Sequence, residues 1–286
     1  MAPAITAHTA LLGVLGHPVG HSLSPAMHNA AIAALGLDWI YLALPVPAEQ
    51  LATVVQGLEA IGCRGLSVTI PHKQTVRALC RQLSPLAERV GAVNTLVPLQ
   101  DGGWLGTNTD VEGFVTPLRG QTWQGRHALV LGNGGSARAV VAGLVELGLG
   151  AITVVGRRAE ALSSFAANCS AWAPQLTTQT LDQPIEPLLT AADLVVNTTP
   201  LGMGSEQCPL NPGQLAALRP GTTVYDLIYV PRPTQLLRQA AGHGCTTIDG
   251  LTMLVHQGAA ALRLWSGRDD VPVDVMATAV EAALRD

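Results

Sequence analysis

The sequence predicts an α/β protein of two domains, each built on a mainly parallel sheet. Apolar, β-rich runs alternate with stretches rich in Ala and Leu, and this alternation occurs twice along the 286 residues. Such a βαβα order is typical of parallel strands joined by crossover helices. Hydrophobic residues make up 48% of the chain and charged residues only 13%, which favours strands that are buried on both faces.

The first series of elements occupies the N-terminal part of the chain. Strands are expected at residues 11–16, 40–44, 66–70 and 93–97, and helices at residues 25–35, 48–61 and 74–79. We expect these elements to form most of the first domain.

The second series follows a glycine-rich stretch, which places the domain boundary near residues 110–125. Strands are expected at residues 128–131, 152–155, 194–197, 223–226 and 246–248, and the first helix at residues 136–147. After Gly250, two helices at residues 252–263 and 274–284 are expected to pack back onto the first domain. The expected domains are therefore residues 1–112 with 252–286, and residues 113–251.

Charge and apolar patterning exclude two classes of partner. The net charge is −4 and no long basic run occurs, so we expect no nucleic-acid partner, because phosphate binding needs clustered Lys and Arg. The first charged residue is Asp38, but His, Pro and Gly interrupt the apolar stretch before it, so no membrane span is expected. Without a positive n-region, the sequence predicts a soluble protein whose first few residues are loose.

Cysteine and histidine positions argue against disulfides and metals. The five cysteines are scattered and form no C-x-x-C pair, which indicates a reducing compartment such as the cytoplasm. His17 and His21 are four residues apart with His28 nearby. Because Pro18 and Gly20 interrupt the helix that such a pair would need, no metal site is expected.

A glycine-rich segment marks a dinucleotide site. Gly132, Gly134 and Ala137 match G-x-G-x-x-[GA] between an apolar strand and a helix. The first glycine allows a tight turn, the second lets the backbone approach a pyrophosphate, and the small third residue lets helix and strand pack closely. The helix N-terminus would then offer free N–H groups to the phosphates. An ordinary glycine-rich turn is the alternative interpretation.

The end of the next strand favours NADP over NAD. NAD sites carry an Asp or Glu there, which binds the ribose hydroxyls. Here the strand ends in Gly156-Arg157-Arg158. A carboxylate would repel a 2′-phosphate, whereas a guanidinium pairs with it. The alternative is that both arginines are solvated surface charges.

Polar side chains follow the expected strands of the first domain. Ser22 and Ser24 precede a helix, and Ser24 is either its N-cap or a ligand-binding hydroxyl. Thr69 and Lys73 follow the strand expected at residues 66–70, where ligands of open α/β sheets bind. His72, beside Lys73, is expected to face solvent, and the alternative is that it tunes the site. Asn94 and Asp110 follow later in the chain. Taken singly, each of these polar residues is weak evidence for a binding site, because polar side chains are usually at the surface.

These segments occur together in a fixed order. The motifs are Ser22-x-Ser24-Pro25, Ser67-Val68-Thr69-x-Pro71-x-Lys73, Gly91-Ala92-Val93-Asn94-Thr95, Asn108-Thr109-Asp110-x-x-Gly113, Gly132-Asn133-Gly134-Gly135, Asn197-Thr198-Thr199-Pro200-x-Gly202-Met203, Asp226-x-x-Tyr229 with Pro231 and Thr234, and finally Gly250, Met253 and Gln257. The sequence thereby resembles the shikimate dehydrogenase family across nearly the whole chain. The resemblance implies a substrate domain, a Rossmann domain that binds NADP, and C-terminal helices that return to the first domain.

The resemblance also implies site residues. Substrate-binding positions are Ser22, Ser24, Thr69, Lys73, Asn94, Asp110, Tyr229 and Gln257, and Lys73 and Asp110 form the catalytic pair. Cofactor positions are Gly132, Asn133, Gly134, Gly135, Ser136, Gly156, Arg157, Arg158, Ile228, Gly250 and Met253. Two positions depart from the family pattern. Ser67 stands where Asn is frequent and has a shorter reach towards ring hydroxyls, and Arg158 stands where Thr is frequent.

The implied activity is the reversible, NADP-dependent reduction of 3-dehydroshikimate to shikimate, a step of aromatic amino-acid biosynthesis. Lys73 would deliver a proton to the ketone oxygen and Asp110 would orient it. The sequence leaves the protonation state of Lys73 in the free protein open. A broader quinate/shikimate dehydrogenase that accepts NAD and a non-catalytic sensor are the alternatives. The oligomeric state is also open, with a homodimer as one possibility.

Overall fold

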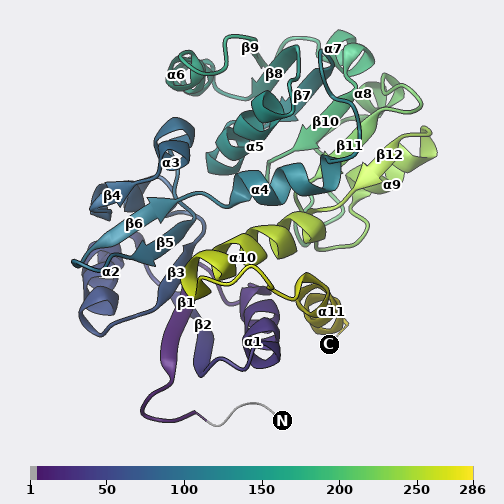
Figure 1. Ribbon diagram of the computed structural model, residues 1–286. Coiled ribbons are helices and arrows are strands. Elements are labelled where there is room, and N and C mark those ends of the chain that lie inside the picture. Colours follow the sequence, from purple (N-terminus) through teal and green to yellow (C-terminus); the bar gives the residue numbers. More distant parts are fainter. Residues whose placement is uncertain (1–4, 286) are drawn as a thin grey trace. The chain divides into compact units, whose positions relative to one another are not determined.

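The computed structural model describes residues 5–285, so part of the N-terminal stretch expected to be loose lies outside the described residues. The chain divides into two compact units (Figure 1). The first consists of the residues up to Gly113 together with those from Leu254 onwards, and the second of Phe114–Met253. Each unit contains a six-stranded sheet accompanied by helices, so the predicted α/β class is confirmed.

The sheet of the first unit is mixed. Its strands are β1 (Ala10–Gly16), β2 (Trp39–Pro45), β3 (Gly65–Val68), β4 (Gln82–Leu83), β5 (Thr95–Pro98) and β6 (Trp104–Thr107), in the order β2-β1-β3-β5-β6-β4. β1 pairs with β2 and β3 in parallel, whereas β5 runs antiparallel to both β3 and β6. The expectation of a mainly parallel sheet was therefore wrong for β5. β4 and β6 were not among the expected strands, and the short connection between β5 and β6 can only form an antiparallel hairpin.

Helices surround this sheet. They are α1 (Ser24–Ala34), α2 (Leu51–Ala60), α3 (Pro85–Val90) and α11 (Val273–Ala283), with 3-10 turns at Ala48–Gln50 and Thr75–Leu79. α10 (Gly250–Ser266) contributes most of its length to the same unit. One face of the sheet carries the apolar cluster of Leu15, Leu66 and Val68 with Leu51 and Val55 of α2.

Residues 110–125, where the sequence places the domain boundary, begin with a helix, and the boundary between the two units falls within it, after Gly113. α4 (Asp110–Val115) is followed by a 3-10 turn at Thr116–Leu118. The backbone N–H of Asp110 donates to Asn108 Oδ1 at 3.0 Å, and such a side-chain acceptor stabilises the start of a helix. Two of the glycines that suggested the domain boundary, Gly102 and Gly103, have φ values of 81° and 84° and form the turn between β5 and β6.

The second unit has a fully parallel sheet. Its strands are β7 (His127–Leu131), β8 (Ala151–Gly156), β9 (Leu176–Thr180), β10 (Leu194–Asn197), β11 (Thr223–Asp226) and β12 (Thr246–Ile248), in the order β12-β11-β10-β7-β8-β9. With β7 numbered as strand 1, the order read from the β9 edge of the sheet is 3-2-1-4-5-6. This is the doubly wound order of dinucleotide-binding folds. Its topological switch point lies between β7 and β10.

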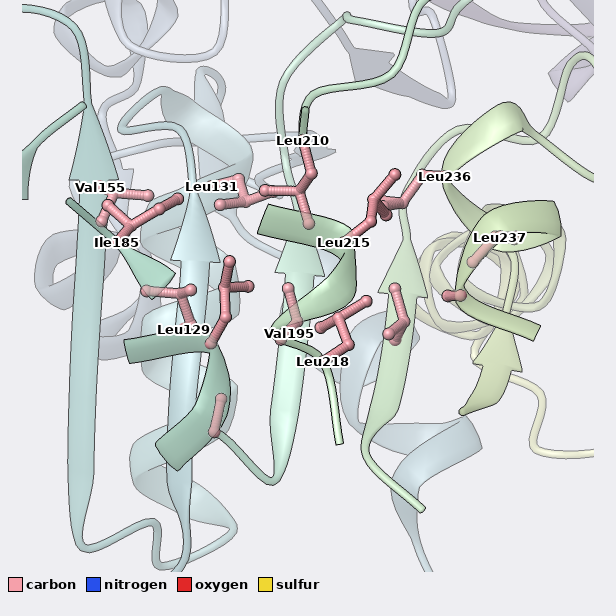
Figure 2. Packing of buried hydrophobic residues seen from close by; sticks show 14 residues of the cluster. Leu129, Leu131, Val155, Ile185, Val195, Leu210, Leu215, Leu218, Leu236 and Leu237 are labelled. Atoms are coloured by element: carbon pink, nitrogen blue, oxygen red, sulfur yellow. The ribbon is translucent and has the colours of Figure 1, made fainter. Parts of the chain in front are cut away.

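The helices of this unit are α5 (Gly135–Glu146), α6 (Ala159–Cys169), α7 (Glu186–Ala191), α8 (Pro212–Ala216) and α9 (Gln235–Gly242). Alternate residues of the strands form one buried face, seen in Figure 2 as Leu129, Leu131, Val155 and Val195 packed against residues of α7, α8 and α9. Every second residue of a strand points to the same face of the sheet, which explains this alternation. This core fixes the carboxyl ends of β7 and β8, where the glycine-rich segment and the arginines follow.

Candidate functional site

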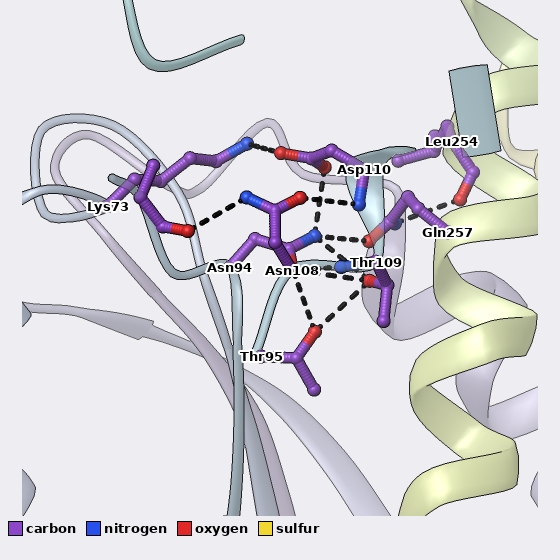
Figure 3. A network of polar contacts seen from close by, with 9 residues as sticks. Lys73, Asn94, Thr95, Asn108, Thr109, Asp110, Leu254 and Gln257 are labelled. Atoms are coloured by element: carbon purple, nitrogen blue, oxygen red, sulfur yellow. Dashed lines mark hydrogen bonds and ion pairs between the residues drawn. The ribbon is translucent and has the colours of Figure 1, made fainter. Parts of the chain in front are cut away.

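Lys73 and Asp110 form an ion pair in the first unit (Figure 3). Lys73 Nζ lies 2.6 Å from Asp110 Oδ2, and the two side chains are only 14% and 6% exposed. Lys73 follows the turn after β3, and Asp110 is the first residue of α4. A short, largely dehydrated contact between an ammonium and a carboxylate is a strong interaction of defined geometry.

Asn94 holds the other oxygen of this carboxylate. Its Nδ2 donates to Asp110 Oδ1 at 2.8 Å, and its Oδ1 accepts from the backbone N–H of Thr109 at 2.7 Å. The hydroxyl of Thr95 also donates to Asn94 Oδ1, at 2.9 Å. Because both Asp110 oxygens are engaged, the carboxylate is fixed in position and can in turn fix the lysine.

Two further amides complete the group drawn in Figure 3. Asn108 Nδ2 donates to the carbonyl of Ala92 at 2.9 Å. Gln257, on α10, has its Oε1 at 3.4 Å from Asn94 Nδ2 and donates from Nε2 to the carbonyl of Leu254 at 2.9 Å. The sequence analysis did not assign a role to Asn108 or Thr95, although both lie in the quoted motifs. Their contribution is to hold Asn94 and the start of α4.

Ser22, Ser24 and Thr69 lie outside this hydrogen-bonded group. The Ser22 hydroxyl accepts from the backbone N–H of Ser24 at 3.3 Å. α1 begins at Ser24, its N-cap position is Leu23, and no side chain caps it. The N-cap interpretation of Ser24 was therefore wrong, and its hydroxyl is available for another contact. Thr69 directly follows β3, and its backbone N–H donates to Leu15.

His72 is buried, so the expectation that it faces solvent was wrong. It is 1% exposed, and its Nε2 lies 2.7 Å from the carbonyl oxygen of Val46. The turn after β3 directs the ring to the backbone that follows β2, and a buried ring nitrogen needs such a partner. His72 therefore anchors the turn that carries Lys73.

Tyr229 lies in the second unit, in the segment between β11 and α9. It is partly buried, and burial raises the pKa of its phenol. Asp226, at the end of β11, holds this segment: its Oδ1 accepts from the backbone N–H of Ile228 at 3.1 Å and from Asn197 at 2.9 Å, and its Oδ2 accepts from Thr234 at 2.7 Å. Burial raises the pKa of Asp226 as well.

The glycine-rich segment has the geometry of a phosphate-binding turn. Gly132 has a φ of 100°, and a Cβ atom there would lie 2.7 Å from Thr198 Oγ1. At Gly134 a Cβ atom would meet nothing within 4 Å. α5 starts at Gly135 with no side chain capping it, and Ala137 is fully buried. The N–H groups of Gly135 and Ser136 in its first turn can therefore bind an anion, and the open space at Gly134 fits the pyrophosphate of a dinucleotide.

The other predicted cofactor residues lie in the same unit. Gly156 ends β8, and a Cβ atom there would lie 3.2 Å from Asn133 Oδ1. Arg157 and Arg158 follow it and are exposed, and no ion pair among the described residues involves either. Ile228 and Met253 are buried. At Gly250 a Cβ atom would clash with the carbonyl of Leu227, so this position accepts only glycine. Two exposed guanidinium groups thus follow β8 beside the glycine-rich segment.

Two negative findings concern residues 5–285. No cluster of three His, Cys, Asp or Glu side chains in this part of the chain could hold a metal ion. None of its helices is both long and apolar enough to cross a membrane.

Known proteins resemble this chain over its whole length. Residues 14–96 match the family model for the shikimate dehydrogenase substrate binding domain, and residues 250–281 match that for the shikimate 5′-dehydrogenase C-terminal domain. The shikimate dehydrogenase (NADP(+)) of Trichormus variabilis is 50% identical over 98% of this chain and 99% of its own length.

Solved structures extend the comparison. A shikimate dehydrogenase in complex with NADP+ has a TM-score of 0.90 at 33% identity, with 99% of this chain and 98% of that chain covered. The Thermus thermophilus enzyme in complex with NADP(H) and shikimate has a TM-score of 0.85 at 36% identity, covering 96% and 100%. A quinate dehydrogenase from Corynebacterium glutamicum in complex with NAD has a TM-score of 0.87 at 30% identity, covering 96% and 99%.

Proposed function

This chain belongs to the shikimate dehydrogenase family, and we propose that it catalyses the reversible, NADP-dependent reduction of 3-dehydroshikimate to shikimate. It is an oxidoreductase that acts on a secondary alcohol. The observation that carries the proposal is the ion pair of Lys73 and Asp110, 2.6 Å apart and held by Asn94. In this proposal the first unit binds the substrate and the second binds NADP.

Lys73 moves the proton. NADPH, when bound, supplies the hydride that reduces the ketone carbon. Negative charge then develops on the ketone oxygen, and the Lys73 ammonium stabilises it and donates one proton to complete the alcohol. In the oxidising direction the neutral amine takes the proton back. Asp110 orients Lys73 throughout.

The residue type at position 73 supports this role. The whole sequence contains 16 Lys and Arg residues, and Lys73 is its single lysine. Arginine does not give up a proton in proteins, whereas lysine does. Among the 16 Lys and Arg residues, the one side chain that can serve as both acid and base therefore stands in the ion pair with Asp110, a signal that the sequence analysis missed.

The polar residues of the first unit suit a hydroxylated ring acid. We assign the ring hydroxyls to Thr69, Asn94 and Gln257, whose hydroxyl and amide groups can donate and accept. Ser22 and Ser24 are candidates for the carboxylate. The Ser24 hydroxyl caps no helix, and the Ser22 hydroxyl, which accepts from the backbone N–H of Ser24, keeps its hydrogen to donate. Tyr229 remains a prediction of the family resemblance. A site built on hydrogen bonds discriminates strongly against analogues that lack a hydroxyl.

Replacing Gly134 by Ala is expected to raise the KM for NADP roughly 10-fold, equivalent to about 1.4 kcal/mol. The added methyl group would occupy the open space beside the first turn of α5, where the pyrophosphate approaches. The free energy of unfolding should stay unchanged, because no protein atom lies within 4 Å of the new Cβ. Steady-state kinetics with varied NADP and urea denaturation measure the two quantities.

Gly132→Ala is the matched control for this variant. Its Cβ would lie 2.7 Å from Thr198 Oγ1 at a φ of 100°, so we expect a loss of roughly 1–3 kcal/mol of stability. An unchanged KM for NADP in Gly134→Ala would contradict the cofactor position.

Replacing Arg157 by Ala is expected to raise the KM for NADPH about 10-fold, since a hydrogen bond to a charged group contributes roughly 1.5–3 kcal/mol. The KM for NADH should change much less, because NADH has no 2′-phosphate. Kinetics with both nucleotides provide the test, with Arg158→Ala measured in parallel. Equal changes for NADPH and NADH would refute the assignment of Arg157 to the 2′-phosphate.

Broader substrate use is the alternative that one comparison favours, because a quinate dehydrogenase in complex with NAD has a similar fold. The first experiment is therefore the formation of reduced nucleotide from shikimate or quinate with NADP or NAD. Turnover confined to shikimate and NADP supports the proposal. Comparable rates with quinate or NAD support the broader enzyme, and shikimate binding without turnover supports a sensor.

Assembly and location are further parts of the proposal. β2 is an edge strand of its sheet, and Leu42 on it is 41% exposed. An open strand edge of this kind can pair with a second copy, so we propose a homodimer, which sedimentation analysis would test.

The five cysteines are free, which fits a reducing cytoplasm.

A further inference from the structure

Besides the Nε atom of Arg77, three polar side chains of the first unit have buried atoms without a hydrogen-bond partner among residues 5–285. They are His28, through both ring nitrogens, Tyr41, through its hydroxyl, and Ser67, through its hydroxyl. Leaving a buried donor or acceptor unpaired costs roughly 1–3 kcal/mol, so each such group calls for a physical explanation. For Tyr41 and Ser67, their positions in the sheet provide such an explanation.

Strand register places Tyr41 and Ser67 on one face of the sheet. β1 pairs Leu12 with Tyr41 of β2 and with Gly65 of β3, so these residues lie side by side. Ser67 is two residues beyond Gly65 and therefore points to the same face, closer to the carboxyl end of the strand. The Tyr41 hydroxyl reaches diagonally across β1 towards Ser67. The hydroxyls of Ser67 and Ser24 act to lower the Tyr41 pKa, although the larger effect of burial raises it.

The Tyr41 ring is held rigidly. Its backbone N–H and C=O bond to the amide of Asn29, each at 2.9 Å. The ring stacks on His28 with centroids 4.2 Å apart, and Trp265 lies 6.0 Å away on another side. A Cβ atom on Gly65 would lie 2.4 Å from Trp265, so glycine at that position makes room for the indole. This packing fixes where the phenol hydroxyl points.

We infer that Tyr41 is a positioning residue for shikimate, acting through Ser67. This inference rests on the proposed function. Tyr41 is fully buried, so it acts on the substrate through another side chain. Ser67 stands where the family often has the longer Asn. In the inferred substrate complex, the Tyr41 hydroxyl, unpaired in the free protein, donates a hydrogen bond to Ser67 Oγ, which leaves the Ser67 hydrogen directed at a ring oxygen of the substrate. Accepting this bond also makes the serine a stronger donor, because linked hydrogen bonds polarise one another.

The test is a double-mutant cycle of Tyr41→Phe and Ser67→Ala in shikimate oxidation. Tyr41→Phe is expected to raise the KM for shikimate roughly 3- to 10-fold, the value of one ordinary hydrogen bond. The kcat and the KM for NADP should change less than about 2-fold, and urea denaturation should show no loss of stability, since the lost hydroxyl was unpaired. In the Ser67→Ala background, adding Tyr41→Phe should have no further effect on the KM.

Tyr225→Phe is the matched control, because the Tyr225 hydroxyl is also buried and unpaired within residues 5–285 but belongs to the second unit. It should leave the KM for shikimate unchanged. An unchanged KM in Tyr41→Phe, or an equal effect with and without Ser67, would overturn the inference. If the wild-type protein does not oxidise shikimate, the proposed function fails. The double-mutant cycle is then measured by calorimetry, with the Kd for shikimate in place of the KM. If shikimate does not bind, both the proposed function and the inference about Tyr41 are overturned.

Discussion

Replacing Lys73 by Ala is expected to lower the kcat for shikimate oxidation by a factor of about 10²–10⁴, the usual contribution of a general acid–base group. The substrate hydroxyl would then have no side chain to take its proton as the hydride leaves. The KM for NADP should be almost unchanged, because the glycine-rich turn proposed to bind the phosphates belongs to the other unit. Single-turnover measurements would show whether the chemical step carries the loss.

Lys73→Arg is the informative control for this variant. It keeps a positive charge that can pair with Asp110, but a guanidinium cannot act as the base. We therefore expect Lys73→Arg to be nearly as slow as Lys73→Ala in the oxidising direction. Turnover close to that of the wild type in either variant would refute the role of Lys73 as proton carrier.

The second large effect is a loss of stability in acid caused by His28. The ring is fully buried, and burial lowers its pKa from 6.5 to about 3. Between these two values the unfolded chain binds a proton that the folded protein does not bind. The stability contributed by neutral His28 is therefore fully present above pH 6.5 and is lost as the pH falls. The expected loss is about 1.4 kcal/mol per pH unit, or about 2.7 kcal/mol two units below the unfolded pKa.

Urea denaturation at several pH values between about 4.5 and 7, most of them between the folded and unfolded pKa values of His28, provides the measurement. His28→Phe keeps a ring that can stack on Tyr41 but does not titrate, so its stability should fall less steeply in acid. His8→Gln is the control, because His8 is exposed and its loss should leave the pH dependence unchanged. Parallel pH profiles for the wild type and His28→Phe would count against the buried histidine as the cause.

The parallel sheet of the second unit was largely predictable from the sequence. The strands at residues 194–197, 223–226 and 246–248 have the predicted ends in the structure, because each is a short β-rich run bounded by polar or turn-forming residues. β9 was missed because Leu176–Thr180 is mostly polar and lies partly exposed at the edge of the sheet. An edge strand needs no continuous apolar run, so the sequence pattern that would predict it is weak.

The candidate site was predictable in its residues but not in its contacts. Lys73 and Asp110 are 37 residues apart, and only the fold brings their side chains within 2.6 Å. His72 was misassigned because its partner, the carbonyl of Val46, lies 26 residues away. Tyr41 gave no signal at all: within a hydrophobic strand it looks like an ordinary core aromatic. Pairings between distant segments are set by tertiary structure, which local patterns do not encode.

The single lysine has a practical consequence for spectroscopy. Reductive methylation with isotope-labelled formaldehyde modifies amines and leaves guanidinium groups untouched, so Lys73 would give the one side-chain signal in a chain whose other 15 basic residues are arginines. The chemical shift of a methylated amine follows its ionisation. A titration of this signal, with and without shikimate, would therefore read out the charge state of the proton carrier directly, free of overlap from any other lysine.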